Sequence, residues 1–448
     1  MIRYRPDALV VGGQLQRGAA LLVGDDGLVA AEAHGPVQDV PLPGKLLVPG
    51  FVNAHSHAFQ RVLRARTEFL APGNERDDFW SWREAMYAAA DSLTPEQLYD
   101  VSKQCFLEMA LAGVTTVGEF HYVHHQPGGA PYDDAQLLAR QVIAAARDVG
   151  LRIVLLRVGY ARAGFNVAPN ARQRRFIDPD AETMLRRTHD LAALMKDDPL
   201  VTVGLAPHSV RAVPLSWLRT VAREWTAGPL HMHVAEQPAE LRACEAEYGV
   251  TPVALLAREG LLSERFTGVH AIHLSPDEIA ALGRARANVC ACPSTERNLG
   301  DGIVRADELL AAGASISLGS DSHAHVGMLE EAQMLEGHLR LLRLRRNVLN
   351  TPGGVWPTLL DSLSASGARS LGLSPSSLRA GERADFVTLD LQHPTLLGVD
   401  DARVLMSAPS ASVREVFVAG RRIVTDGRHA AQEETAARFT RVMAALTR

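Results

Sequence analysis

Residues 50–61 read GFVNAHSHAFQR, an apolar run that ends in two histidines separated by one residue. Side chains two residues apart on a β-strand point to the same face, so His55 and His57 can present their imidazoles together at a strand end. Imidazole nitrogens are common ligands of divalent metals. The pair alone is weak evidence, because 17 histidines are spread over the 448 residues. It becomes informative when the same arrangement recurs on other strands.

Eight short apolar or β-branched runs can be identified in the chain, at residues 46–57, 114–122, 152–160, 201–209, 228–236, 266–274, 287–295 and 314–321. Amphipathic helical stretches lie between most of them. In residues 92–113, Thr94 and Gln97 form a capping-box pattern with Pro95 at the first helical position. This alternation predicts β-α-β units and a parallel sheet, and eight units over about 280 residues match a closed (β/α)8 TIM barrel. A doubly wound open sheet is the alternative, because alternation alone does not establish closure.

The two ends of the chain read differently from its middle. Short strand-like pieces separated by turns precede the first barrel strand and follow residue 383, with little helix among them. We therefore predict a small β-sandwich domain built from both termini, over residues 1–48 and 378–448. The barrel is expected over residues 49–377. A final helix-like stretch, residues 434–448, follows the last strands.

The charge balance and the lack of long apolar segments argue against nucleic acids and membranes as partners. With 51 acidic and 46 basic residues the net charge is −5, so the basic excess needed to follow a phosphate backbone is missing. The N-terminal residues lack the pattern of a secretory signal, and no apolar run approaches the roughly 20 residues of a membrane helix. We expect a cytoplasmic homodimer that acts on a small molecule and binds neither nucleic acid nor a membrane.

Polar residues lie at the carboxyl ends of several of the predicted strands. Because all strands of a (β/α)8 barrel open on one face, residues that are distant in sequence meet there. Histidine nitrogens and a carboxylate gathered in this way can share one metal ion. Beyond His55 and His57, the residues concerned are His208 on the fourth run, His231, His233 and Glu236 on the fifth, His270 and His273 on the sixth, and Asp321 on the eighth.

Four of these segments together resemble the amidohydrolase superfamily: PGFVNAHSH (49–57), HVAE (233–236), the strand end at His270, and SLGSD (317–321). The likeness covers nearly the whole chain, and the order of the segments resembles the deaminase branch. It implies an amidohydrolase-type barrel with the metal ligands His55, His57, His233 and Asp321, and with Glu236, His270 and Asp321 as catalytic groups. His231 shares a strand face with His233 and is the alternative ligand.

The scarcity of lysine bears on the number of metal ions. Amidohydrolases with two metals use a carboxylated lysine at the end of the fourth barrel strand, and none of Lys45, Lys103 or Lys196 lies there. A single divalent metal ion is therefore expected. Three nitrogens and one carboxylate with an open position favour Zn²⁺, with Fe²⁺ or Mn²⁺ as alternatives.

Longer segments resemble one family of that superfamily, the N-formimino-L-glutamate iminohydrolases: NAHSHAFQR (53–61), FWSWRE (79–84), FHYVHH (120–125), GLAPHSVRAV (204–213), LHMHVAEQPAE (230–240) and CPSTERNLGDGIV (292–304). The resemblance implies hydrolytic deimination of N-formimino-L-glutamate to N-formyl-L-glutamate and ammonia, a step of histidine degradation. The two carboxylates of that substrate need donors, and the planar arginine fork binds a carboxylate bidentately. The candidate substrate-binding residues are Arg83, Arg211 and Tyr122 for the carboxylates, with Gln60 and His208 nearer the metal.

Two other functions and one plainer interpretation stay open at this point. A guanine, cytosine or S-adenosylhomocysteine deaminase of the same superfamily would need an aromatic or apolar clamp for a ring. A non-catalytic zinc-binding barrel is the alternative from another class, and the presence of both Glu236 and His270 argues against it. Arginine supplies nearly all the basic residues, so Arg83 and Arg211 can also be ordinary surface salt-bridge partners.

Overall fold

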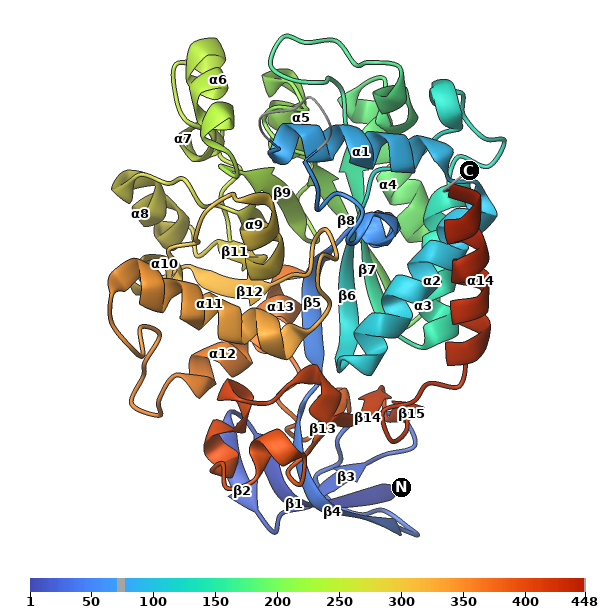
Figure 1. Cartoon of the computed structure of the whole chain (residues 1–448), viewed down its shortest axis with the longest axis vertical. Helices are drawn as coiled ribbons and strands as arrows, with labels where there is room; N and C mark the ends of the chain where they lie inside the picture. The colour runs from blue at the N-terminus through green and yellow to red at the C-terminus, as the bar shows by residue number, and fades with distance from the viewer. Residues whose placement is uncertain (71–76, 447–448) are drawn as a thin grey trace.

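The computed structural model describes residues 1–70 and 77–446 and has a barrel at its centre (Figure 1). Eight strands run parallel and pair in the order in which they occur in the sequence. They are β5 (Phe51–Ser56), β6 (Val114–His121), β7 (Arg152–Gly159), β8 (Val201–Pro207), β9 (Leu230–Val234), β10 (Phe266–His270), β11 (Asn288–Ala291) and β12 (Ser315–Leu318). Each predicted run contains one of these strands, so the predicted (β/α)8 barrel is confirmed.

The first and last barrel strands meet just beyond the carboxyl ends of β5 and β12. Ser56 and Asp321 form a parallel bridge. The backbone N–H of Asp321 donates to the carbonyl of His55 at 3.0 Å, and the N–H of His57 donates to the carbonyl of Asp321 at 3.2 Å. This pairing closes the sheet and excludes the open doubly wound alternative.

Helices cover the outside of the barrel, and most of them begin where the sequence predicts. At the start of the helix that begins at Pro95, the N–H of Gln97 donates to Thr94 Oγ1 at 3.2 Å, and the N–H of Thr94 donates to Gln97 Oε1 at 3.0 Å, which confirms the predicted capping box. The helices of the described residues are α1 (Phe79–Ser92), α2 (Pro95–Leu111), α3 (Leu137–Val149), α4 (Ala181–Met195), α5 (Leu215–Glu224), α6 (Pro238–Tyr248), α7 (Pro252–Arg258), α8 (Pro276–Arg284), α9 (Pro293–Leu299), α10 (Ala306–Ala312), α11 (Met328–Arg343), α12 (Trp356–Leu363), α13 (Ala365–Ser370) and α14 (Gln432–Leu446).

A second sheet is built from both ends of the chain, as predicted. Its strands are β1 (Ile2–Val11), β2 (Gln14–Arg17), β3 (Leu21–Val23), β4 (Gln38–Pro49), β13 (Phe386–Asp390), β14 (Val413–Val418) and β15 (Arg421–Val424). They form one mixed sheet rather than the two sheets of a sandwich, because the long β4 pairs parallel with β1 and antiparallel with β13. The domain boundaries at residues 48 and 378 stay a prediction.

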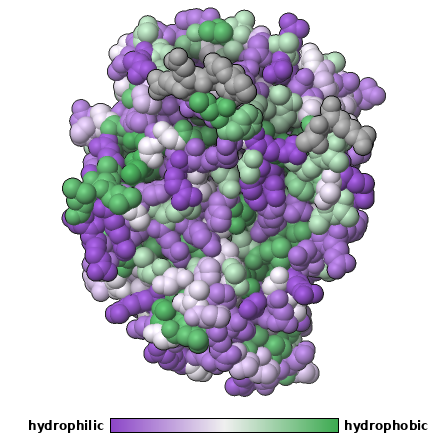
Figure 2. Space-filling view, in the orientation of Figure 1, coloured by the Kyte–Doolittle hydropathy of each residue, from purple (hydrophilic) through white to green (hydrophobic). Residues whose placement is uncertain are grey.

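The last helix and the surface complete the outline. The C-terminal helix α14 lies beside α2 on the flank of the barrel, away from the small sheet (Figure 1). Figure 2 shows hydrophilic residues interspersed with hydrophobic ones over one face of the molecule. No helix among the described residues is long and apolar enough to cross a membrane.

Candidate active site

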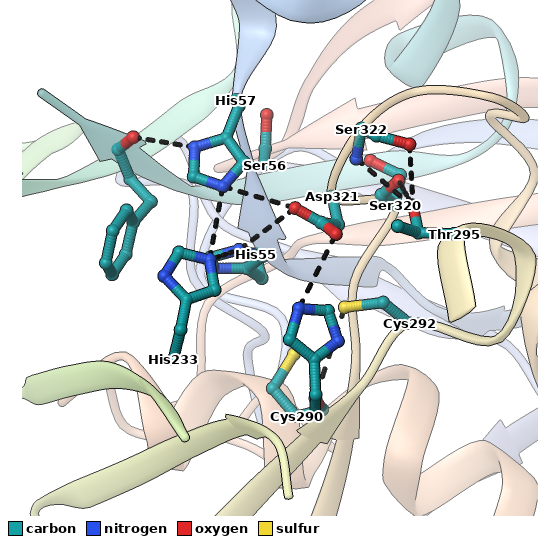
Figure 3. Close-up of polar contacts among 12 residues, drawn as sticks. His55, Ser56, His57, His233, Cys290, Cys292, Thr295, Ser320, Asp321 and Ser322 are labelled. Carbon is teal, nitrogen blue, oxygen red and sulfur yellow. Dashed lines mark hydrogen bonds and ion pairs between the residues drawn. The ribbon is translucent and has the colours of Figure 1, made fainter. Parts of the chain in front are cut away.

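Four side chains meet at the mouth where β5 and β12 close the barrel: His55, His57, His233 and Asp321, which we call the metal cluster. One donor atom from each of them lies within 4.8 Å of the donor atoms of the others. Asp321 Oδ1 is 3.3 Å from His55 Nε2 and 3.2 Å from His57 Nε2. Figure 3 shows the three rings and the carboxylate pointing toward one another. All four residues are buried.

The hydrogen bonds of the rings show that this donor set fits a cation. His57 Nδ1 lies 3.0 Å from the carbonyl of Phe120, and His233 Nδ1 lies 3.1 Å from the carbonyl of His208. A carbonyl can only accept, so each Nδ1 carries the proton and each Nε2 presents a lone pair. The Nε2 atom of His233 is 3.1 Å from that of His55 and 3.4 Å from that of His57. Nitrogen lone pairs held this close favour a metal ion among them.

A buried polar network lies directly behind the two strand-end histidines. Glu119 accepts hydrogen bonds from the backbone N–H of Ala58 at 2.7 Å and from Ser56 Oγ at 2.5 Å. Ser56 Oγ also lies 3.1 Å from His323 Nε2, and His323 Nδ1 lies 3.1 Å from Ser320 Oγ. These contacts hold the backbone of β5 and of the segment around Asp321 in one arrangement. The rings of the metal cluster are therefore oriented from behind as well as by their own partners.

Glu236 and His270 lie beside the metal cluster. His270 Nε2 is 3.5 Å from Glu236 Oε1 and 3.7 Å from Asp321 Oδ2. His270 and Asp321 both have left-handed backbone conformations, with φ of 70° and 47°, which non-glycine residues adopt at a cost. These turns at the ends of β10 and β12 direct two side chains of different strands toward the same point.

Burial and neighbouring groups shift the pKa values of Asp321, His55 and Glu236, and the direction of the shift differs among the three residues. Burial acts to raise the pKa of the Asp321 carboxyl, but the neighbouring imidazoles of His55 and His57 outweigh it and hold that pKa well below its usual range. Burial lowers the pKa of His55 to about 3, so that ring is neutral and able to bind a metal. Burial also raises the pKa of Glu236, which suits a group that takes up and releases a proton.

The five predicted substrate-binding residues all line one pocket with His57, His233, Glu236 and Asp321. Gln60 Nε2 donates to the hydroxyl of Tyr122 at 2.9 Å, and Gln60 Oε1 is buried and has no hydrogen-bond partner in the described part of the chain. The ring of Tyr122 lies against those of His57 and His208, with centroids 5.2 Å and 5.8 Å away. Gln60, Tyr122 and His208 thus form the part of the pocket wall next to the metal cluster.

Arg83 and Arg211, which we call the arginine pair, provide another part of the same wall. Both guanidinium groups contact the indole of Trp80, whose ring centroid is 4.6 Å from Arg83 Cζ and 5.6 Å from Arg211 Cζ. In each arginine Nε and Nη1 are buried and have no hydrogen-bond partner among the described residues. Neither arginine forms a salt bridge with the residues that the structure describes, and their unpartnered N–H groups suit an anionic ligand.

Two histidines close in sequence to the predicted site residues have hydrogen-bond partners outside the metal cluster, and the three lysines lie elsewhere in the fold. His231 Nε2 bonds to the carbonyl of Ser370 at 2.7 Å, outside the metal cluster, so His233 is the histidine of β9 that reaches His55, His57 and Asp321. His273 Nε2 bonds to the carbonyl of Asp301 at 2.9 Å. None of the three lysines lies at the end of β8, the fourth barrel strand: Lys45 is on β4, Lys103 on α2, and Lys196 at the end of α4.

Several side chains in and behind the pocket were not identified from the sequence. Phe79, Trp82, Met86 and Tyr87 of α1 and Leu299 of α9 contribute apolar wall. The buried carboxylates of Glu240 and Glu296 contact Glu236 and His270. The motif FWSWRE contains Phe79 and Trp82, but only Arg83 in it was predicted as a site residue, as a cation for a carboxylate.

Comparison with known proteins agrees with this architecture. Residues 46–423 match the model of the amidohydrolase family. A formimidoylglutamate deiminase of Pseudomonas aeruginosa is 40% identical over 414 residues, which cover 90% of each chain. A crystal structure of an amidohydrolase from Brucella melitensis superposes with a TM-score of 0.92 at 33% identity over all of both chains.

A more distant structure shows the fold alone. It is a zinc-bound adenosine deaminase from Xanthomonas campestris, 21% identical, with a TM-score of 0.84 over 100% of this chain and 98% of its own. The family model spans most of the chain, and the identity to the deiminase holds along nearly its full length. With the barrel and the metal cluster at its mouth, these matches establish that the chain belongs to the amidohydrolase family.

Proposed function

We propose that this protein hydrolyses N-formimino-L-glutamate to N-formyl-L-glutamate and ammonia. The observation that carries the proposal is the arginine pair, whose unpartnered N–H groups line the same pocket as the metal cluster. The substrate has matching parts, because its amidine carbon needs hydrolytic chemistry and its two carboxylates need cationic partners. The 40% identity to a formimidoylglutamate deiminase over 90% of both chains supports this choice of substrate.

The metal cluster is proposed to hold one divalent ion, most simply Zn²⁺, through His55, His57, His233 and Asp321. Three imidazole nitrogens and one carboxylate oxygen form a donor set that zinc accepts. Such an ion, when bound, supplies a Lewis acid and makes water acidic enough to ionise near neutral pH. The absence of a lysine at the end of β8 supports a single ion rather than a pair.

The residues beside the metal cluster are proposed to move the protons of the reaction. Asp321 accepts a proton from the attacking water, and Glu236 delivers a proton to the departing nitrogen. His270 contacts both carboxylates through Nε2 and is placed to stabilise the tetrahedral carbon. Collapse of that carbon breaks its bond to the terminal nitrogen, which leaves as ammonia, and the formyl group stays on the glutamate.

The pocket wall is proposed to hold the glutamate part of the substrate. Arg83 and Arg211 bind its carboxylates, assisted by the hydroxyl of Tyr122. Gln60 and His208 contact the substrate nearer the reacting carbon. Because Gln60 Oε1 is buried and has no partner within residues 1–70 and 77–446, it can accept a hydrogen bond from an N–H of the formimino group.

Product analysis separates this proposal from its alternatives. Zinc-loaded enzyme is incubated with N-formimino-L-glutamate, and ammonia, formamide, N-formyl-L-glutamate and glutamate are quantified. The expected products are ammonia and N-formyl-L-glutamate in equal amounts. Formamide with glutamate contradicts the proposed bond cleavage. Turnover of guanine, cytosine or S-adenosylhomocysteine without turnover of the formimino substrate indicates a ring deaminase, and no turnover of any of them indicates a metal-binding barrel without catalysis.

The setting of this activity is also a proposal. We infer a homodimer in the cytoplasm that acts on a free small molecule. The mass of the purified protein by light scattering tests the dimer, because a monomer has about half the expected value. Fractionation of the source cells tests the location.

A further inference from the structure

The segment from Cys292 to Asp301 contains a buried acid that the proposed reaction does not use. It follows β11 and forms α9, whose Leu299 lines the pocket. Glu296, in the first turn of α9, is buried. This position places a carboxylate behind His270, while the metal cluster lies on the Nε2 side of the same ring.

The contacts of Glu296 determine the protonation of His270 Nδ1. Glu296 Oε1 lies 3.3 Å from His270 Nδ1 and accepts a hydrogen bond from the backbone N–H of Cys292 at 2.8 Å. An oxygen that already accepts from a backbone N–H and faces an imidazole nitrogen acts as an acceptor there too. Nδ1 therefore carries a proton and donates it to Glu296. On the opposite side of the ring, Nε2 lies 3.5 Å from the nearest oxygen of Glu236 and 3.7 Å from that of Asp321.

A purely structural role explains this acid poorly. Capping the backbone at Cys292 requires only a neutral oxygen, whereas a buried carboxylate loses its hydration and needs a compensating partner. In the part of the chain that the structure describes, no lysine or arginine forms an ion pair with Glu296, and its partner is His270. The charge of Glu296 is therefore explained by the histidine that it contacts.

We propose that Glu296 is a positioning residue that holds the Nδ1–H group of His270 and fixes the ring so that Nε2 points at the reacting carbon. The proposal rests on the proposed function for the identity of the reaction, and on the contacts of residues 270, 292 and 296 for the rest. It follows the general arrangement in which a third group orients an acid or base that acts on the substrate.

The kinetic test is a double-mutant cycle between Glu296→Gln and His270→Gln. Glu296→Gln is expected to lower kcat about 10- to 100-fold, the usual effect of losing such a supporting partner, with KM and metal content within about twofold of the parent. In the His270→Gln background the same change is expected to cost less than about twofold, because the residue it acts through is gone. Equal losses in both backgrounds overturn the proposal.

Glu331→Gln is the matched control. Glu331 is a buried carboxylate that accepts the backbone N–H of Ser294 at 2.9 Å, so it supports the same segment without touching His270. Its substitution is expected to leave kcat within about twofold. A loss as large as that of Glu296→Gln shows that the integrity of the segment, and not the orientation of His270, is responsible.

Nuclear magnetic resonance of histidine-labelled protein tests the proposal independently of turnover. The Nδ1 proton signal that disappears in His270→Gln is expected to shift in Glu296→Gln and to stay in place in Glu331→Gln. An unchanged signal in Glu296→Gln overturns the proposal. If the parent enzyme does not hydrolyse N-formimino-L-glutamate, the proposed function fails, while this measurement still decides the role of Glu296.

Discussion

The metal cluster and the arginine pair line one pocket, but different elements hold them. His55, His57 and His233 stand on barrel strands, and backbone carbonyls fix the outer nitrogens of His57 and His233. Arg83 stands on α1 and Arg211 follows the end of β8, and both rest against aromatic rings with N–H groups unpartnered. The rings of His57 and His233 are thus oriented by the fold itself, whereas the N–H groups of the arginine pair have no partner among the described residues and are left for a ligand. Changes to the metal cluster should therefore affect the chemistry itself, and changes to the arginine pair should affect the choice of substrate.

The largest effect is expected from loss of a metal ligand. His55→Ala and Asp321→Ala should lower kcat/KM by at least roughly 10³-fold, about 4 kcal/mol, because the remaining donors hold the ion weakly. Elemental analysis should find about one metal ion per parent chain and less in His55→Ala. His231→Gln is the control on the same strand as His233, and it should keep its metal. Two ions per active chain, or parental turnover in either alanine variant, contradicts the assignment.

Glu236→Gln tests whether catalysis is separable from metal binding. The amide keeps the size of the side chain but cannot carry the proton, so kcat should fall roughly 10²- to 10⁴-fold. Metal content should match that of the parent, because Glu236 is not one of the four ligands. A variant that retains full kcat removes Glu236 from the proton path. If the Glu236→Gln variant loses its metal, Glu236 is itself a metal ligand.

Arg83→Met and Arg211→Met test whether the arginine pair binds the carboxylates of the substrate. Each change keeps bulk but removes a charge-assisted pair worth on the order of 2–4 kcal/mol, so kcat/KM for N-formimino-L-glutamate should fall about 30- to 1000-fold. Metal content and the thermal midpoint should not change. If both variants hydrolyse the substrate as fast as the parent, the carboxylates bind elsewhere and a neutral ring becomes the better substrate.

The control for the arginine pair needs an arginine outside the pocket. Arg223 has a side chain that is 65% exposed and pairs with Glu224, so Arg223→Met removes one positive charge without touching the site. Arg162 is unsuitable, because its Nε donates to the carbonyl of Arg211 at 3.0 Å. Equal losses in Arg223→Met and Arg211→Met would indicate a general effect of charge.

The smallest effect is expected outside both regions. Thr94→Ala removes the N-cap of α2 and should lower the free energy of unfolding by about 1 kcal/mol. Because the cap lies outside the pocket, kcat/KM should stay within about twofold of the parent. Denaturant unfolding followed by circular dichroism measures the first quantity, and the standard assay measures the second. A large loss of activity would contradict this prediction, because it would show that the shape of the pocket depends on how α2 begins.

Strand-borne features of this molecule were predictable from sequence, because a strand places alternate side chains on one face. The spacing of His55 and His57 therefore predicts their shared orientation, and the repeated strand-helix alternation predicts the barrel. The same rule does not distinguish His231 from His233, which share a face of β9. Their difference arises from depth in the barrel, where His231 meets the carbonyl of Ser370.

Helix-borne and loop-borne features were less predictable. The supporting role of Glu296 was not visible, because an acid in the first turn of a helix is ordinarily read as a favourable interaction with the helix N-terminus. The placement of the arginine pair depends on how α1 crosses the mouth and on the aromatic rings beside it. The sequence identified Arg83 and Arg211 only through resemblance to a family. The single mixed sheet formed by the termini likewise depends on pairings that the strand pattern does not specify.

The closure of the barrel through Ser56 and Asp321 has a consequence for how the protein forms. The residues that join the first and last barrel strands neighbour or belong to the metal cluster, and more than half of the chain separates them in sequence. Contacts between such distant segments form slowly, because much of the chain must be ordered first. During synthesis, the histidines of β5 leave the ribosome early and cannot pair with the segment after β12 until that segment has been made. We therefore expect the site to be completed late in folding, and a chain truncated before residue 321 would carry three of the four proposed metal ligands and lack Asp321.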